Sequence, residues 1–534
     1  MRMVRLAWLA AGMACFATVT SAQTHDHGVA RLGTVEFKVD CSTPAQQQFN
    51  SAMALYHSFA WPQAIAAFKA VAAADPACGM AQWGLAISLL NNPFVWPANL
   101  SPQVVTDVGA ALEAAKVAGL KTQRERDYVE AVVVFVRDPA NTPYPKRLQA
   151  YDAAMSQVAA RYADDAEAAI LSALITSANF DPTDKTYANQ LKAARILESM
   201  SGARPNHPGV AHYLIHSYDY PPIAKQGLEA AKAYSAIAPD AAHALHMPSH
   251  IFTRVGYWRE SITANRESAR VAGDATFDGH HATDYMVYAH LQLAQDEAAR
   301  AAMRRSLDMK PIDNFAAAFA YAAMPARVAL ERGDWAAAAT LALAPAADAY
   351  PWKKYPQAEA VNAYARGIGA ARANAAAGAR EQQTRLIALR EAAKELKLTY
   401  WAEQIDVQAA VLGALALCAE SKSAECIDGL KAAAMREDAT EKHVVVPGPL
   451  VPARELLAEM LLTQRKFAEA LREYEAVMAK EPNRYRTLAG AMTAAQGAGD
   501  QAKARATATE LRTLGKDADT QRDSLQQAKQ LAGG

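Results

Sequence analysis

Apolar side chains recur every three to four residues along most of the chain, which is the period of an amphipathic α-helix. The stretch YANQLKAARILESM, residues 187–200, shows this pattern over its whole length. The run VEAVVVF, residues 129–135, is rich in β-branched residues, but its charged flanks favour a buried helix. No alternation of apolar and polar residues is long enough to predict a strand. The pattern therefore predicts an all-α protein.

The helical pattern carries the marks of the tetratricopeptide repeat, a 34-residue pair of antiparallel helices. In this repeat small residues stand near positions 8 and 20, an aromatic residue near 24 and often proline near 32. A frame from Ala45 puts Ala52, Ala64, Phe68 and Pro76 at these positions, and a frame from Val451 puts Ala458, Ala470, Tyr474 and Pro482 there. Gly256, Gly333 and Gly499 mark further helix-to-helix turns. We therefore expect a solenoid of antiparallel helix pairs.

Proline, glycine and polar runs suggest the divisions of the chain. The segment HVVVPGPLVP contains three prolines and a glycine, so it cannot continue a helix. The predicted parts are a signal peptide (1–22), a mobile arm (23–40), a main helical array (41–442), a Pro-rich connector (443–452), a C-terminal repeat pair (453–518) and a polar tail (519–534).

The N-terminus has the composition of an export signal. Arg2 and Arg5 flank a short apolar stretch, and Thr20-Ser21-Ala22 supplies the small residues that a signal peptidase requires. We expect cleavage after Ala22 and a periplasmic or secreted protein. A lipoprotein anchored at Cys15 is the alternative. No later run is long and apolar enough to predict a membrane span.

The remaining cysteines and the charge balance narrow the possibilities further. In an exported chain, four cysteines favour disulfides, and local pairing predicts Cys41 with Cys78 and Cys418 with Cys426. Lys plus Arg equals Asp plus Glu, 55 each. A nucleic-acid partner is therefore not expected, because such proteins carry a basic excess or stripe.

Histidines form a ladder with the spacing of the repeat. His212, His246 and His280 are each 34 residues apart, and His216, His250 and Asp284 keep the same step. Two histidines at i and i+4 share one helix face and can hold one cation, and packed helices lie about 8–10 Å apart. These six residues are the predicted metal ligands, facing the concave groove of the solenoid. Imidazole ligands suit Zn, Cu, Fe or Ni.

Three segments resemble a known family. HPGVAHYLIHSYD (207–219), HALHMPSHIFTRVGYW (243–258) and PGPLVPARELL (447–457) are similar to segments of exported bacterial tetratricopeptide-repeat proteins. The resemblance covers nearly the whole mature chain, and the histidine segments are its most specific part. It implies an all-helical solenoid and carries no established reaction.

Two classes of function remain open. The first is an exported scaffold whose histidine-lined groove binds a transition metal, a peptide or protein partner, or both. The alternative is a metal-dependent enzyme of the hydrolase class that uses the same ladder. Repeat duplication alone can also copy histidines without a function. No nucleophile elbow, phosphate loop or haem-attachment motif is present in the sequence.

Overall fold

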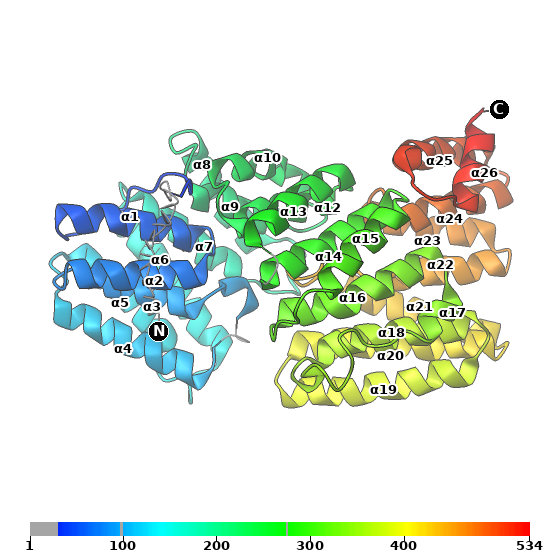
Figure 1. Cartoon of the computed structure of the whole chain (residues 1–534), viewed down its shortest axis with the longest axis horizontal. Coiled ribbons are helices and arrows are strands. Elements are labelled where there is room, and N and C mark those ends of the chain that lie inside the picture. The colour runs from blue at the N-terminus through cyan, green and yellow to red at the C-terminus, as the bar shows by residue number, and fades with distance from the viewer. Residues whose placement is uncertain (1–29, 97–99, 274–275, 534) are drawn as a thin grey trace, which may run out of the picture. The chain divides into compact units, whose positions relative to one another are not determined.

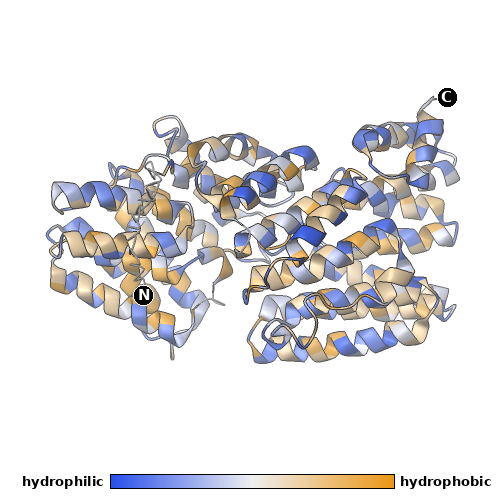
Figure 2. Cartoon of the chain, viewed as in Figure 1, coloured by the Kyte–Doolittle hydropathy of each residue, from blue (hydrophilic) through white to orange (hydrophobic). Residues whose placement is uncertain are grey.

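The computed structural model of the chain describes residues 30–96, 100–273 and 276–533. Over these residues the regular structure is entirely helical and contains no strand, as the apolar period predicts. The predicted signal peptide and Cys15 lie outside the described residues. Figure 1 shows the helices packed side by side along the chain, and in Figure 2 most helices carry both hydrophilic and hydrophobic residues.

The helices follow one another with short connections, and consecutive helices pack together as pairs. The first part of the chain contains α1 (Thr43–His57), α2 (Trp61–Ala74), α3 (Gly79–Leu90), η1 (Pro93–Val95), α4 (Pro102–Ala118), α5 (Gln123–Val136), α6 (Tyr144–Arg161), α7 (Ala166–Ala178) and α8 (Ala188–Ser201). The middle contains α9 (Pro208–Tyr218), η2 (Ala224–Gly227), α10 (Leu228–Ile237), α11 (Ala242–His246), α12 (Pro248–Arg254), α13 (Trp258–Ala272), α14 (Phe277–Gln292), α15 (Asp296–Leu307), α16 (Phe315–Arg332) and α17 (Trp335–Ala339). The last part contains η3 (Trp352–Lys354), α18 (Pro356–Arg372), α19 (Ala376–Glu395), α20 (Thr399–Ala419), α21 (Ser423–Asp438), α22 (Ala453–Thr463), α23 (Phe467–Lys480), α24 (Tyr485–Gly497), α25 (Gln501–Leu514), η4 (Gly515–Asp517) and α26 (Asp523–Gly533).

The positions that identify the repeat are buried between helices. Ala52, Ala64, Phe68, Ala458, Ala470 and Tyr474 are each at most 1% exposed. The predicted turns at Gly256, Gly333 and Gly499 all have positive φ, at 71°, 66° and 83°. Such backbone favours glycine and lets the next helix fold back closely. The fold is therefore an all-α array of antiparallel helix pairs, as predicted.

The four cysteines of the described chain form the two predicted disulfides. Cys41 is bonded to Cys78 and Cys418 to Cys426, with Cα–Cα distances of 4.9 and 5.2 Å. The first joins the start of α1 to the start of α3, and the second joins α20 to α21. Each disulfide therefore fixes the packing of neighbouring helices.

Two segments expected to be loose are packed. In the predicted mobile arm, every second residue from Val35 to Val39 is apolar and buried. Phe37 is 1% exposed and packs against Phe49 and Trp83. In the predicted polar tail, α26 buries Leu525, and Arg522 forms a buried ion pair with Asp296. The composition of the two segments does not predict this packing, because a few buried apolar residues or one ion pair are enough to fix a short segment.

The Pro-rich connector contacts the middle of the chain. Tyr285 Oη donates a hydrogen bond to the carbonyl oxygen of Val446 at 3.2 Å, and Arg327 donates one to that of Gly448 at 3.1 Å. Just before it, Lys442 Nζ lies 3.1 Å from Asp219, at the end of α9. The connector therefore joins α14 and α16 to the C-terminal part, and Lys442 before it joins the end of α9.

Among the described residues, one helix is long and apolar enough to cross a membrane by length and composition, and this helix is α20. Half of its apolar window is buried inside the structure. It packs against α18, α19 and α21. These contacts are those of a core helix.

Candidate metal centre

Three successive repeats bring six histidines together. α9 supplies His212 and His216, and α14 supplies His281. His243, His246 and His250 come from α11 and α12. α12 begins at Pro248, a residue that is favoured in a first helical turn. Met247 keeps helical dihedrals (φ −53°, ψ −37°), so His246 and His250 remain one turn apart on the same face.

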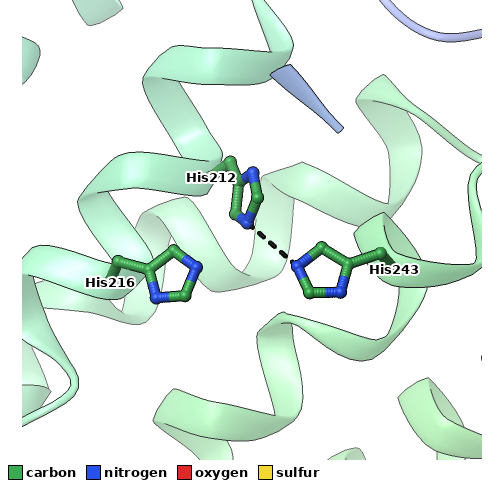
Figure 3. A group of neighbouring side chains, drawn as sticks. All are labelled: His212, His216 and His243. Carbon is green, nitrogen blue, oxygen red and sulfur yellow. Dashed lines mark hydrogen bonds between the residues drawn. The ribbon is translucent and has the colours of Figure 1, made fainter. Parts of the chain in front are cut away.

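Site 1 consists of His212, His216 and His243, whose candidate ligand nitrogens all lie within 4.8 Å of one another. Figure 3 shows the three rings converging from two helices. Nε2 of His212 lies 3.2 Å from Nε2 of His243. Nδ1 of His212 donates a hydrogen bond to the carbonyl oxygen of His57 at 2.6 Å. The neutral His212 ring therefore presents a lone pair at Nε2, toward the centre of the site.

His216 completes site 1 without a hydrogen bond of its own at Nε2. Among the described residues this buried nitrogen has no hydrogen-bond partner. Its ring is stacked on Phe94, with ring centroids 4.0 Å apart, and faces Phe59 on another side. Phe59 also stacks on His243. Aromatic rings thus form one wall of the site, and a buried nitrogen without a partner is costly unless a further group binds it.

Site 2 consists of His246, His250 and His281, again with candidate ligand nitrogens within 4.8 Å of one another. Nε2 of His246 lies 3.0 Å from Nε2 of His250. The His281 ring lies 4.5 Å from that of His246, centroid to centroid. Each site thus has two buried histidines from one turn of helix and one half-buried histidine from the next repeat.

The outer hydrogen bonds of site 2 determine which nitrogens carry protons. Nδ1 of His250 donates to the Asp219 carboxylate at 2.9 Å. Nδ1 of His246 lies 2.6 Å from Oδ1 of Asn265, whose amide nitrogen donates to the Ser261 carbonyl oxygen, so Oδ1 is the acceptor. Both neutral rings therefore carry their proton on Nδ1 and point bare Nε2 lone pairs at each other across 3.0 Å. That contact is repulsive unless a positively charged atom lies between the two nitrogens.

Burial keeps these histidines neutral. It lowers the pKa of His212, His216, His243, His246 and His281 well below the ordinary value, and the neighbouring histidines lower it further. Burial also lowers the pKa of His250, although Asp219 opposes the change. An added proton is therefore a poor candidate for the charge between His246 and His250.

Asp219 is already matched by two cations. Arg254 Nε donates to it at 2.8 Å, and Lys442 Nζ lies 3.1 Å away. Burial alone would raise the pKa of Asp219, but Lys442 and Arg254 bring it well below its usual range. Burial lowers the pKa of Lys442 to about 8. Asp219 thus orients His250 and adds no excess negative charge to the site.

The two sites contact each other. The rings of His216 in site 1 and His250 in site 2 lie 6.1 Å apart, and those of His243 and His246 lie 6.2 Å apart, centroid to centroid. His243 and His246 stand on the same short helix, α11, so one segment supplies a ligand to each site. The six histidines are therefore one continuous cluster with two centres.

A third histidine cluster, which we call the Glu167 triad, is bonded differently. The Glu167 carboxylate lies 3.0 Å from Nε2 of His57 and 2.7 Å from Nε2 of His207. Nδ1 of His57 pairs with Tyr213 Oη at 2.8 Å, and Nδ1 of His207 accepts from the Val210 backbone at 3.3 Å. All four ring nitrogens are satisfied within the chain. We read this cluster as structural.

Four of the six sequence-predicted ligands belong to sites 1 and 2, and two do not. Nδ1 of His280 hydrogen-bonds to Ser306 Oγ at 2.7 Å, and Asp284 forms a buried ion pair with Arg327 at 2.9 Å. One residue along a helix turns the side chain by about 100°, so His281 faces site 2 whereas His280 and Asp284 meet α15 and α16. His281 lies 38 residues after His243, its counterpart in site 1, which is about one helical turn more than the 34-residue repeat.

Two further differences from the sequence-based prediction concern the exposure of the ladder histidines and the inclusion of His243. His212, His216, His246 and His250 are at most 4% exposed, so they are buried between helices and do not line an open groove. His243 was not among the six predicted ligands, although it stands three residues before His246 on α11. Phe94, in η1, packs directly on the His216 ring.

A cavity of about 120 Å³ lies behind the outer hydrogen bonds of site 2. Its lining includes Arg254 and Lys442, the two residues that hold Asp219, and the aromatic side chains of Tyr364 and Trp401. Four lining residues have buried polar atoms without a partner among the described residues: Gln357, Gln404, Gln408 and Glu441. The cavity is thus polar enough to hold water or a small molecule.

Comparisons with known proteins give no family for the chain. No family model matches it, and no curated protein does. Solved structures with similar helical arrangements include the TPR domain of P58(IPK) (11% identity, 92% of this chain and 99% of that one, TM-score 0.20) and a structure titled Naa15/Naa10 bound to HypK-THB (13%, 92% and 74%, 0.26). A designed circular tandem repeat protein matches at 12% identity, over 84% of this chain and 92% of that one, with a TM-score of 0.13. Scores this low carry no argument about function, and the fold stands on the helices described above.

Proposed function

We propose that the chain is a metal-binding helical-repeat protein that holds two transition-metal ions side by side, one in site 1 and one in site 2. The observation that carries the proposal is the pair of bare Nε2 atoms of His246 and His250, 3.0 Å apart. Two imidazoles bound to one ion at about 2.0–2.1 Å in tetrahedral geometry have their nitrogens about 3.3 Å apart. A shared ion thus converts a repulsive contact into two bonds with little movement.

The outer hydrogen bonds support the same proposal. Histidines that bind metals generally donate their other N–H to a carboxylate or carbonyl oxygen, which fixes the ring. His250 does this with Asp219, His246 with the Asn265 side chain and His212 with the His57 backbone. Three of the six histidines are therefore held in the tautomer and orientation that a metal requires.

The test is the metal content of the protein itself. Protein purified without a histidine tag, stripped with a chelator and titrated with Zn, Cu, Fe or Ni should take up two ions per chain and melt at a higher temperature. His250→Ala should lose one ion. His290→Ala is the matched control and should keep two, because the His290 side chain hydrogen-bonds to Gln295 outside both sites. If stripped wild-type protein neither binds nor gains stability from any of these metals, the proposal is wrong.

A hydrolase is the second candidate, because three protein ligands leave a fourth position open for water, as in catalytic zinc sites. The adjoining polar cavity would then be the place for a substrate. Hydrolysis of model esters, amides and phosphate esters by the metal-loaded protein, lost in His250→Ala, would favour it. A scaffold that binds a peptide or protein partner is compatible with either metal role. It would be tested by asking whether metal changes the affinity for that partner.

A further inference from the structure

The candidate ligands of the two sites carry no negative charge. All six candidate ligands are imidazoles, and no carboxylate or thiolate belongs to either group of ligand atoms. The four cysteines of the described chain are in disulfides, so none of them is available as a ligand. A metal ion in either site therefore keeps its full charge.

The carboxylate bonded to these ligands supplies no excess negative charge. The nearest acidic group bonded to a ligand is Asp219, and it is shared with Arg254 and Lys442, so this ion-pair group is itself net positive. The remaining walls include the rings of Phe59, Phe94 and Tyr285. Two divalent ions would place four further positive charges in this buried cluster.

Because the cost of burying an ion rises with the square of its charge, a divalent ion costs about four times as much as a monovalent one here. The repulsion between two neighbouring ions follows the product of their charges and changes by the same factor. Imidazole is a suitable ligand for copper, and cuprous copper, which is monovalent with a filled d shell, accepts two or three ligands without demanding a fourth.

Resting on the proposed function, we propose that the two ions are cuprous, one Cu(I) held by three histidines in each site. Zinc is the strongest competitor, because three histidines and a hydroxide form a known zinc centre. Each zinc ion would need such an added anion, and two zinc ions would repel each other strongly across the contact between His216 and His250. Cu(I) needs no anion, and both sites can fill.

The experiment is an anaerobic titration of stripped, full-length protein with Cu(I), in competition with a coloured Cu(I) chelator, and a parallel titration with Zn(II). Wild-type protein should bind two Cu(I), whereas the second Zn(II) should bind at least about tenfold more weakly than the first. The double variants His212→Ala/His216→Ala and His246→Ala/His250→Ala, which each leave a single imidazole in one site, should each bind one Cu(I), and the two combined none. His290→Ala should bind two. Circular dichroism checks that each variant remains helical.

The outcomes separate this inference from the proposed function. Two Zn(II) ions bound with equal affinity would overturn the cuprous assignment and leave a metal-binding protein. A wild-type chain that takes up only one Cu(I), or none while it binds another metal, would do the same. Failure to bind any metal would overturn both.

Discussion

The Glu167 triad and site 2 both bring histidines together, but they differ in whether every ring nitrogen has a hydrogen-bond partner. In the Glu167 triad a buried carboxylate lies between two histidines, and every ring nitrogen has a partner. In site 2 two rings have partners at Nδ1 and face each other with bare nitrogens. The first cluster carries its negative charge within the chain and is complete. In the second the only carboxylate bonded to a ligand, Asp219, is shared with Arg254 and Lys442, and the two facing nitrogens have no partner but each other, so clustering alone does not identify a candidate metal site.

The largest expected effect is on the complete cluster. Glu167→Ala leaves the buried nitrogens of His57 and His207 without their partner, and should cost about 3–5 kcal/mol of unfolding free energy. Burial alone would raise the pKa of Glu167, but the two histidines lower it below its usual range. Urea unfolding with and without metal measures the loss, which should be the same in both. A loss confined to the metal-loaded protein would place an ion in the triad.

The opposite pattern is expected in site 2. At a free metal concentration of 100 times the dissociation constant, one bound ion stabilises the native state by about 2.7 kcal/mol. Replacing His246 by Ala should abolish the part of this gain that site 2 provides and change the metal-free protein much less than Glu167→Ala does. Thermal melts over a metal titration distinguish the two effects. Equal losses with and without metal would make His246 a structural residue.

Asn265 tests the orientation of His246. Asn265→Ala removes the acceptor for Nδ1 of His246 without touching a ligand, and such changes typically weaken metal binding by about 10–100-fold. Competition with a chelator gives the affinity, and the stoichiometry should stay at two ions. Unchanged affinity would show that the ring needs no such support. Loss of one of the two bound ions would indicate that the substitution disrupts the structure of site 2.

Acid should act on the two clusters in different ways. The pKa of each of the six histidines is lowered in the folded chain, so the unfolded chain binds protons more readily. Stability of the metal-free protein should therefore fall as the pH drops below about 6.5, the unfolded value. The contribution of Glu167 is lost only at lower pH, as the pH falls below its ordinary carboxylate range. A plot of melting temperature against pH should show the decline that the histidines cause. Bound metal should move this decline to lower pH.

The smallest effect is expected at His280, which the spacing of the ladder put among the ligands. His280→Ala should leave the metal content at two ions and cost about 1 kcal/mol for the hydrogen bond to Ser306. Metal analysis of this variant beside His281→Ala decides which of the two adjacent histidines faces site 2. Loss of an ion in His280→Ala alone would restore the sequence-based assignment.

The sequence predicts most of the fold because its signals are local. The apolar period, the small residues at Ala52 and Ala64, and the glycine turns each specify a helix or a helix contact. The i,i+4 pair of His212 and His216 is equally local and was found. His281 was missed because it lies 38 residues after its counterpart His243, about one helical turn more than the repeat, so the 34-residue spacing does not point to it. Asp284 was misassigned because its partner, Arg327, lies far along the chain on α16.

The shared segment of α11 has a consequence for how such a centre can grow. His243 belongs to site 1 while His246 and His250 belong to site 2, so each added unit of this type would lengthen the row by one candidate site. The row is closed at both ends. One repeat before His243 stands Gly209, where a Cβ would lie 2.5 Å from the His57 ring. One repeat after His250, Asp284 is neutralised by Arg327, a cation belonging to the chain itself. The number of candidate sites is thus limited at both ends by residues of the chain itself.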